Sequence, residues 1–297
     1  MKLQGRKGSS NIEDRRGRGG GSMFGGGAGR AGSFGIGTII IMVVVFFLGG
    51  NPLEYLGIGG GGNQATQTTP GERGEDLNET GSYANIVSVT LQETENVWNN
   101  VFPQQYGRNY KEPVLVLFSG QDRSACGFAS AATGPFYCPA DQKVYIDLSF
   151  ADQLRKRFGS PGDFALAYVV AHEVGHHVQN LLGYSQQVNQ ARQRSSKEQA
   201  NAMSVRLELQ ADYLAGVWAN YANRDGQLLE QGDIQEAITA ATAIGDDRLQ
   251  MEAQGYVVPE SFTHGTSEQR VRAFTEGYRS GDASKAAMDR YFSARNL

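Results

Sequence analysis

The most apolar stretch of the chain lies near its N-terminus, where residues 31–53 contain no ionisable side chain. The centre of this stretch, residues 39–48, consists only of isoleucine, methionine, valine, phenylalanine and leucine. A helix of these 23 residues is about 34 Å long, enough to cross a hydrocarbon core of about 30 Å. Ten strongly apolar residues are also typical of a signal-peptide core or a buried strand. No Ala-x-Ala-like cleavage site follows and glycine-rich segments flank both ends, so we predict an uncleaved transmembrane helix over residues 31–53.

The pattern of hydrophobic and polar residues changes after residue 53. Residues 54–81 are rich in Gly, Gln and Thr and show no apolar periodicity, which is typical of a flexible linker. The remaining residues, 82–297, contain no further linker and no internal repeat, and we predict that they form one domain.

Within this domain, apolar positions at helical spacing predict a helix over residues 84–102 that ends at Pro103. Residues 113–119 and 143–148 have the β-branched and aromatic content of strands. From residue 158 onward the pattern is mainly helical. A helix, a small sheet and then a run of helices predict an α+β fold.

Charge is distributed unevenly along the chain. The first 30 residues carry seven basic and two acidic side chains, whereas the rest carries 20 basic and 29 acidic ones. A basic flank favours the cytoplasmic side of a span, so we predict a single-pass protein whose N-terminus stays in the cytoplasm. The N-terminal tail, residues 1–30, would then be cytoplasmic and the domain periplasmic or extracellular. The Arg- and Gly-rich tail also resembles an RNA-binding tail, but a topology signal that contacts lipid is favoured and no nucleic acid is expected.

The chain has two cysteines, Cys126 and Cys138. In an exported domain the simplest interpretation is a disulfide. A reactive or metal-binding thiol pair is the alternative, although this spacing fits no zinc template.

The candidate chemistry lies in a helix that Ser160 and Pro161 are expected to start and Gly183 to end. Its first turns are apolar on all sides, which indicates a buried helix. His172 and His176 are one turn apart on one face, so both imidazoles can reach the same zinc ion. Glu173 lies beside the open position of that ion, where it can take a proton from the attacking water. A chance match is the alternative.

A third ligand is expected on a second long helix, which starts near Ser195 with a capping-box pattern and runs to about Tyr221. Glu208 and Asp212 lie at positions i and i+4 of this otherwise apolar helix, where unpaired carboxylates would be costly. We therefore predict Glu208 as a zinc ligand and Asp212 as the acceptor for the second ring N–H of a ligating histidine. An exposed acidic face is the alternative.

His-Glu-x-x-His followed by Glu208-x-x-Ala-Asp212 resembles the gluzincin metallopeptidases. The anchored N-terminus, the segments around Cys126 and Cys138, the extended helix motif at residues 171–179 and His264-Gly-Thr-Ser resemble the bacterial putative neutral zinc metallopeptidase family. This resemblance covers most of the chain. It implies a single-pass inner-membrane zinc peptidase, with one Zn²⁺ per chain, acting on a peptide or unfolded protein, and it supplies a class rather than a substrate.

Further roles follow from this comparison. In gluzincins a residue from a later segment stabilises the oxyanion, and His264 is the first candidate for this role, with Arg270 and Tyr256 as lesser ones. A histidine that caps or packs at the end of a loop is the alternative. His177 points about 100° away from the metal face, so either a role in supporting the metal ligands or a structural role is expected. By analogy with other zinc peptidases, residues 143–148 are a candidate edge strand for substrate.

Two other function classes stay open. One is a zinc-containing but catalytically silent scaffold or binding protein of the envelope. The other is a protein whose main function lies in an RNA- or lipid-binding tail, with the domain as cargo.

Overall fold

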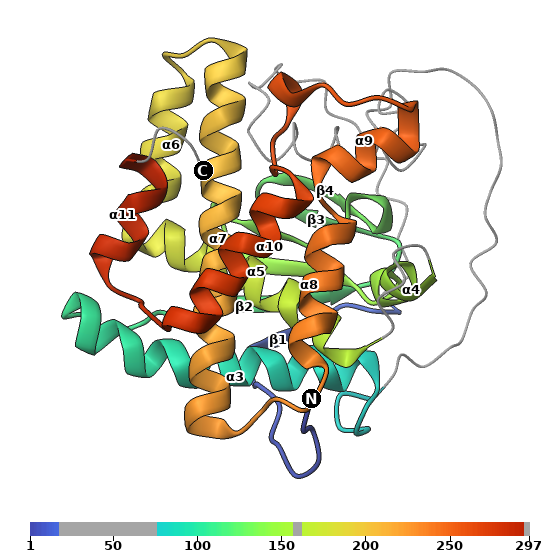
Figure 1. Cartoon of the computed structure of the whole chain (residues 1–297). Helices are drawn as coiled ribbons and strands as arrows, with labels where there is room; N and C mark the ends of the chain where they lie inside the picture. Colours follow the sequence, from blue (N-terminus) through green and yellow to red (C-terminus); the bar gives the residue numbers. More distant parts are fainter. Residues whose placement is uncertain (18–75, 157–161, 294–297) are drawn as a thin grey trace, which may run out of the picture.

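The computed structural model describes residues 1–17, 76–156 and 162–293 (Figure 1). It confirms a mainly helical α+β fold with small sheets. The predicted transmembrane helix at residues 31–53 and most of the predicted linker lie outside these residues. Among the described residues, no helix combines the length and apolarity needed to cross a bilayer.

The larger sheet of the described residues has the strand order β1-β2-β6-β5. β1 (Ile12–Asp14), β2 (Val114–Phe118) and β6 (Lys143–Asp147) are parallel, and β5 (Phe136–Cys138) pairs antiparallel with β6. The predicted strands at residues 113–119 and 143–148 are therefore confirmed. β6 is an inner strand between β2 and β5, however, so the prediction that it forms the edge for substrate is wrong.

The two faces of this sheet are covered differently. Leu115 and Leu117 of β2 point into the main core under the helices, whereas Val116 and Phe118 belong to a smaller apolar cluster on the opposite face. This alternation is the period of two expected of a strand that is buried on both sides. A hairpin of β3 (Gln121–Ser124) and β4 (Gly127–Ser130) contributes to the smaller cluster.

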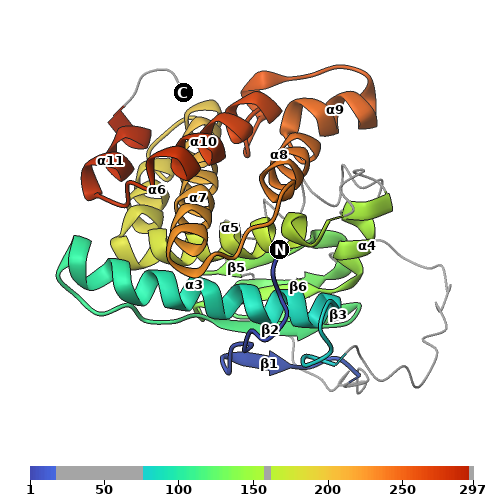
Figure 2. The same ribbon diagram turned by 60° about the horizontal axis from the view of Figure 1, so that its bottom comes forward.

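The helices stack above the sheet (Figure 2). α3 (Tyr83–Tyr106) and α5 (Asp163–Leu182) pack against each other, and α7 (Lys197–Gly226) packs on α5. α10 (Ser267–Ser280) has its most extensive interface with α7. The other α-helices among the described residues are α4 (Ser149–Lys156), α6 (Tyr184–Arg192), α8 (Asp233–Ala243), α9 (Asp246–Gln254) and α11 (Lys285–Ser293).

The helices begin and end within a few residues of the positions that capping residues in the sequence predict. Ser82 caps α3, as the predicted domain start near residue 82 requires, but α3 passes through Pro103 and ends at Gly107, which has φ 65°. Proline removes only one hydrogen bond of the last turn, and the left-handed glycine stops the helix. The capping box of α7 uses Ser196 and Gln199, one residue later than predicted. Gly183 ends α5 as predicted.

Residues 1–17 differ from their predicted place in a separate tail. They form β1 and lie against β2 and α3, with the backbone N–H of Leu115 donating to Asn11 at 2.9 Å and that of Ser9 donating to Ser88 at 3.0 Å. The described domain therefore includes these residues as well as those after residue 76.

Candidate metal centre

The packing of α5 on α7 brings three predicted zinc ligands together. His172 and His176 of α5 and Glu208 of α7 place their ligand atoms within 4.8 Å of one another. Gly175 allows this close approach, because a Cβ there would lie 3.0 Å from the backbone oxygen of Ala211. A larger residue would push apart the two helices that carry the ligands.

The spacing of these atoms fits a zinc ion. Nε2 of His172 lies 3.2 Å, and Nε2 of His176 3.5 Å, from the same Glu208 oxygen. Ligand atoms about 2.0–2.1 Å from zinc in a tetrahedral site are about 3.3 Å apart. Two imidazoles and one carboxylate are also a donor set of catalytic zinc, which keeps a fourth position for water or substrate. These three residues therefore fit the zinc ion that the sequence predicts.

Asp212 orients His172. One carboxylate oxygen of Asp212 lies 2.7 Å from Nδ1 of His172, which therefore donates to it, while Nε2 faces the Glu208 oxygen. Arg270 donates two hydrogen bonds to the same carboxylate, at 2.8 and 3.0 Å. The Tyr168 hydroxyl donates another at 2.5 Å. Burial alone would raise the pKa of Asp212, but Arg270 and His172 hold it well below its ordinary value. Asp212 is thus an ionised acceptor of hydrogen bonds from His172, Arg270 and Tyr168.

His176 has an orienting partner that the sequence analysis missed. Its Nδ1 donates to Oε1 of Gln179 at 2.8 Å, and the Gln179 amide donates in turn to Leu207 and to Gln210. Gln179 lies three residues after His176 on the same helix, so the i, i+3 spacing was the available signal. Both candidate ligands on α5 are therefore oriented by a hydrogen bond at Nδ1.

Glu173 is buried beside the metal ligands, with 8% of its surface exposed. The backbone N–H of Tyr137, in β5, donates to its carboxylate. Burial raises the pKa of Glu173, while the neighbouring His176 and His172 oppose that rise. A carboxyl group with a raised pKa next to a metal site is suited to accept and return a proton.

His177 links α5 to neighbouring elements through both ring nitrogens. Its Nε2 donates to the backbone oxygen of Lys111 at 2.6 Å, and its Nδ1 accepts from the Tyr137 hydroxyl at 3.0 Å. Burial lowers the pKa of His177 to about 4, so the ring is neutral at neutral pH. It fixes α5 to β5 and to the segment before β2.

His264 lies in the loop between α9 and α10 and is held by Asp246. One oxygen of Asp246 lies 3.1 Å from Nδ1 of His264, and the other accepts the backbone N–H groups of residues 263–265. His264 makes no direct bond to the metal ligands, but the charge of Glu208 acts on it. The lesser candidates are placed differently. The Arg270 guanidinium is bonded to Asp212, Tyr168 and the backbone oxygen of Ile244, and Tyr256 is 59% exposed.

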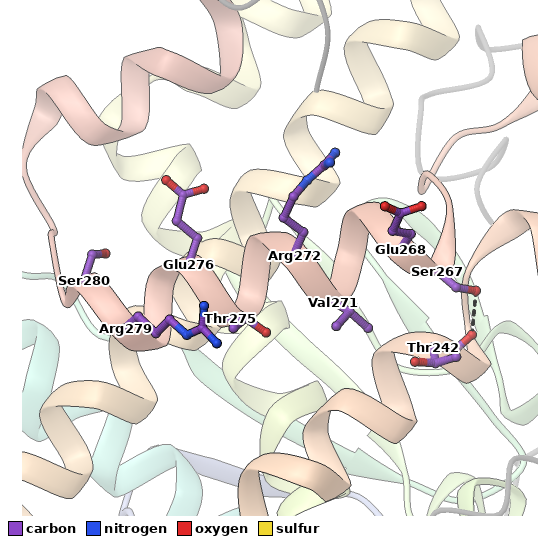
Figure 3. Close-up of a pocket in the computed structure, with 9 residues that line it drawn as sticks. All are labelled: Thr242, Ser267, Glu268, Val271, Arg272, Thr275, Glu276, Arg279 and Ser280. Carbon is purple, nitrogen blue, oxygen red and sulfur yellow. Dashed lines mark hydrogen bonds between the residues drawn. The ribbon is translucent and has the colours of Figure 1, made fainter.

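Two further features lie outside this centre. Cys126 and Cys138 form the predicted disulfide, which ties the β3–β4 hairpin to β5. A separate cavity of about 750 Å³ lies between α8 and α10, and none of its lining residues belongs to the metal centre (Figure 3). Its walls come from the end of α8 and the face of α10 that bears Val271, Thr275 and Arg279.

Comparison with known proteins agrees with this centre. A family profile described as "Putative neutral zinc metallopeptidase" matches residues 1–288. An uncharacterized Escherichia coli protein named YpfJ is 46% identical over 285 residues, which cover 96% of this chain and 97% of that protein. An uncharacterized Mycobacterium tuberculosis protein is 45% identical over 206 residues, covering 66% of this chain and 67% of the relative. No solved structure is significantly similar to the chain.

Proposed function

The chain belongs to the family described as putative neutral zinc metallopeptidases, and we propose that it hydrolyses peptide bonds with zinc held by His172, His176 and Glu208. The observation that carries the proposal is the gathering of three zinc-type ligand atoms within 4.8 Å beside a buried Glu173. Structural zinc sites are usually closed by four protein ligands. A three-residue group next to a general base instead favours catalysis.

Zinc would supply a Lewis acid that polarises the peptide carbonyl and increases the acidity of water. Glu173 takes the proton of the attacking water and then gives it to the leaving amine. Its raised pKa supports both steps, because the group is a stronger base than an exposed carboxylate and can still release the proton. The N–H of Tyr137 and the packing of α5 hold this carboxylate in place.

β5 is the strand proposed to bind substrate. It is the outer strand of the sheet on the side of the metal centre, and its central residue, Tyr137, contacts Glu173. An extended peptide added beside β5 would pair through main-chain hydrogen bonds and pass next to the general base. β5 takes this role in place of the inner strand β6.

His264 is proposed to stabilise the oxyanion. Burial alone would lower its pKa, but Asp246 and Glu208 raise it above the ordinary value of 6.5. The raised pKa favours the charged imidazole, which is the form that stabilises negative charge in the transition state. Asp246 acts through His264 as a positioning residue.

Changing His264 to Asn is expected to lower kcat by about 10²–10³-fold with zinc content unchanged, since one oxyanion donor is lost. In the unaltered protein, kcat should fall as pH rises through the raised pKa of His264, because the donor loses its charge there. The variant should lack this alkaline decline. The measurement is a pH–rate profile of both proteins, and an unchanged kcat would remove His264 from the reaction.

Removal of the metal tests the proposed activity directly. The zinc-loaded full chain is expected to cleave an unfolded protein, to lose this activity with a chelator, and to regain it with added Zn²⁺ but not Mg²⁺, which prefers oxygen ligands. Metal content and cleavage products are measured together. Cleavage that survives complete metal removal contradicts the proposal, and stoichiometric zinc without cleavage favours the silent scaffold.

Attachment to a bilayer through residues 31–53 rests on the sequence alone and is separate from the proposed activity. The single-pass orientation, with a cytoplasmic N-terminus and the domain outside, stays a prediction, and the packing of residues 1–17 on the domain argues against it. Labelling of the two ends of the chain tests it.

A further inference from the structure

The N-terminal segment, residues 1–17, is built into the sheet and the helical layer. β1 pairs with β2 in parallel register, from Ile12 opposite Leu115 to Asp14 opposite Leu117. The backbone N–H of Arg15 extends this pairing with a bond to Leu117 at 2.8 Å, and that of Lys2 donates to Leu228 at 2.8 Å. The segment therefore contacts both the sheet and the chain after α7. Figure 2 shows β1 alongside β2, with α3 above.

Side chains of residues 1–17 make apolar and polar contacts with the domain. Met1 and Leu3 are buried in the main core. Glu95 of α3 is only 3% exposed, and its carboxylate accepts hydrogen bonds from Ser9 at 2.6 Å and Asn11 at 2.9 Å. A buried carboxylate needs such partners, since an unpaired one is costly. The segment thus satisfies a buried charge of the domain.

The close backbone approach at Gly8 and two ion pairs also support the contact between residues 1–17 and the domain. A Cβ at Gly8 would lie 2.1 Å from Oγ of Ser88, so the segment can approach α3 this closely only with glycine there. Arg6 pairs with Glu93 at 2.6 Å, and Arg15 pairs with Asp122 at 2.9 Å. These arginines were counted as a topology signal, but each has a carboxylate partner in the domain.

Both ends of the stretch between residues 17 and 76 emerge at one edge of the domain. Gly17 follows the carboxyl end of β1, next to Asp122, and helps to line a small pocket there with Phe118, the last residue of β2. Tyr83, at the start of α3, reaches Asp152 of α4, which follows the carboxyl end of β6. The parallel strands β1, β2 and β6 end at this same edge.

A single crossing of a bilayer between residues 17 and 76 would place the segment and the domain about 30 Å apart on opposite sides. Strand pairing and ion pairs cannot form across that distance. We infer that residues 1–17 fold as one unit with residues 76–156 and 162–293, so that both lie in the same compartment. The inference goes beyond the proposed peptidase activity and does not depend on it.

Cysteine labelling of the full chain tests the inference. Lys7→Cys in the segment and Ala286→Cys in the domain are both at exposed positions, and the native cysteines are paired. Each variant is treated with a membrane-impermeant maleimide in intact and in permeabilised cells. The two positions are expected to be both labelled or both protected in intact cells. Labelling of one position and protection of the other would overturn the inference and support the single-pass prediction.

Charge exchange provides a second measurement. Arg6→Glu and Glu93→Arg are each expected to lower the Tm of the full chain by about 3–6 °C and to speed protease cleavage within residues 1–17. The double variant should recover most of both effects, because the ion pair is restored with reversed sign. Lys7→Glu is the matched control, since Lys7 is exposed on the same segment. Losses that simply add in the double variant would show that the segment does not dock.

Discussion

Replacement of Glu173 by glutamine is expected to lower kcat for cleavage of an unfolded protein by about 10²–10⁴-fold while zinc stays near one ion per chain. Glutamine has the same length as glutamate and can still accept the N–H of Tyr137, so the packing around α5 is kept. It cannot take a proton from water. The three ligand atoms are supplied by other residues, and metal binding should therefore persist.

The measurement combines metal analysis with cleavage rates on the same preparation. Glu198→Gln is the matched control, because Glu198 is an exposed carboxylate in the first turn of α7 and should change neither quantity. Undiminished cleavage by the Glu173 variant would falsify the assignment of the general base. Loss of zinc together with activity would instead identify Glu173 as a ligand.

Replacement of Glu208 by alanine is expected to abolish both stable zinc binding and cleavage. Glu208 is the only carboxylate among the three ligands, and its oxygen faces both imidazoles at 3.2 and 3.5 Å. Without it two histidines are left, one fewer protein ligand than catalytic zinc sites use. The side chain is also buried, so the variant loses packing as well as charge.

Zinc content after dialysis, the zinc dissociation constant and the Tm together separate these effects. Glu198→Ala on the same helix is the control and should keep zinc and activity. A Glu208→Ala protein that is folded but binds zinc weakly supports the assignment. Zinc binding that survives unchanged in the folded variant would remove Glu208 from the metal centre.

Much of this centre could be predicted from the sequence because its signals are local. His172 and His176 are one helical turn apart, and Glu208 and Asp212 repeat that spacing on a second helix. Apolar residues around both motifs indicated buried helices, in which paired carboxylates need partners. The zinc group and the orienting role of Asp212 follow from these facts, and the geometry agrees with both.

Other parts of the centre depend on contacts between distant residues. Arg270 reaches Asp212 across 58 positions, and Asp246 reaches His264 across 18. No periodicity marks which buried carboxylate a given cation will meet. From the sequence, Arg270 was therefore a candidate for stabilising the oxyanion. In the structure its guanidinium instead donates to Asp212.

Strand order also depended on tertiary structure. The composition of residues 143–148 indicated a strand, but β6 is an inner strand because β5, only three residues long, pairs on its outer side. Likewise, the basic residues of the first 17 positions could be read as a topology signal. Only the fold shows that Arg6 and Arg15 meet carboxylates of the domain.

The sequence by itself thus determined the class of chemistry, since helical spacing and capping act within a few residues and fix which side chains share a face. The tertiary structure decided which strand lies at the edge, which cation neutralises Asp212 and where residues 1–17 lie. Those outcomes depend on apolar faces and buried polar groups that meet across long separations in the sequence. A given residue pattern is compatible with several such partners, and only the packed core selects one of them.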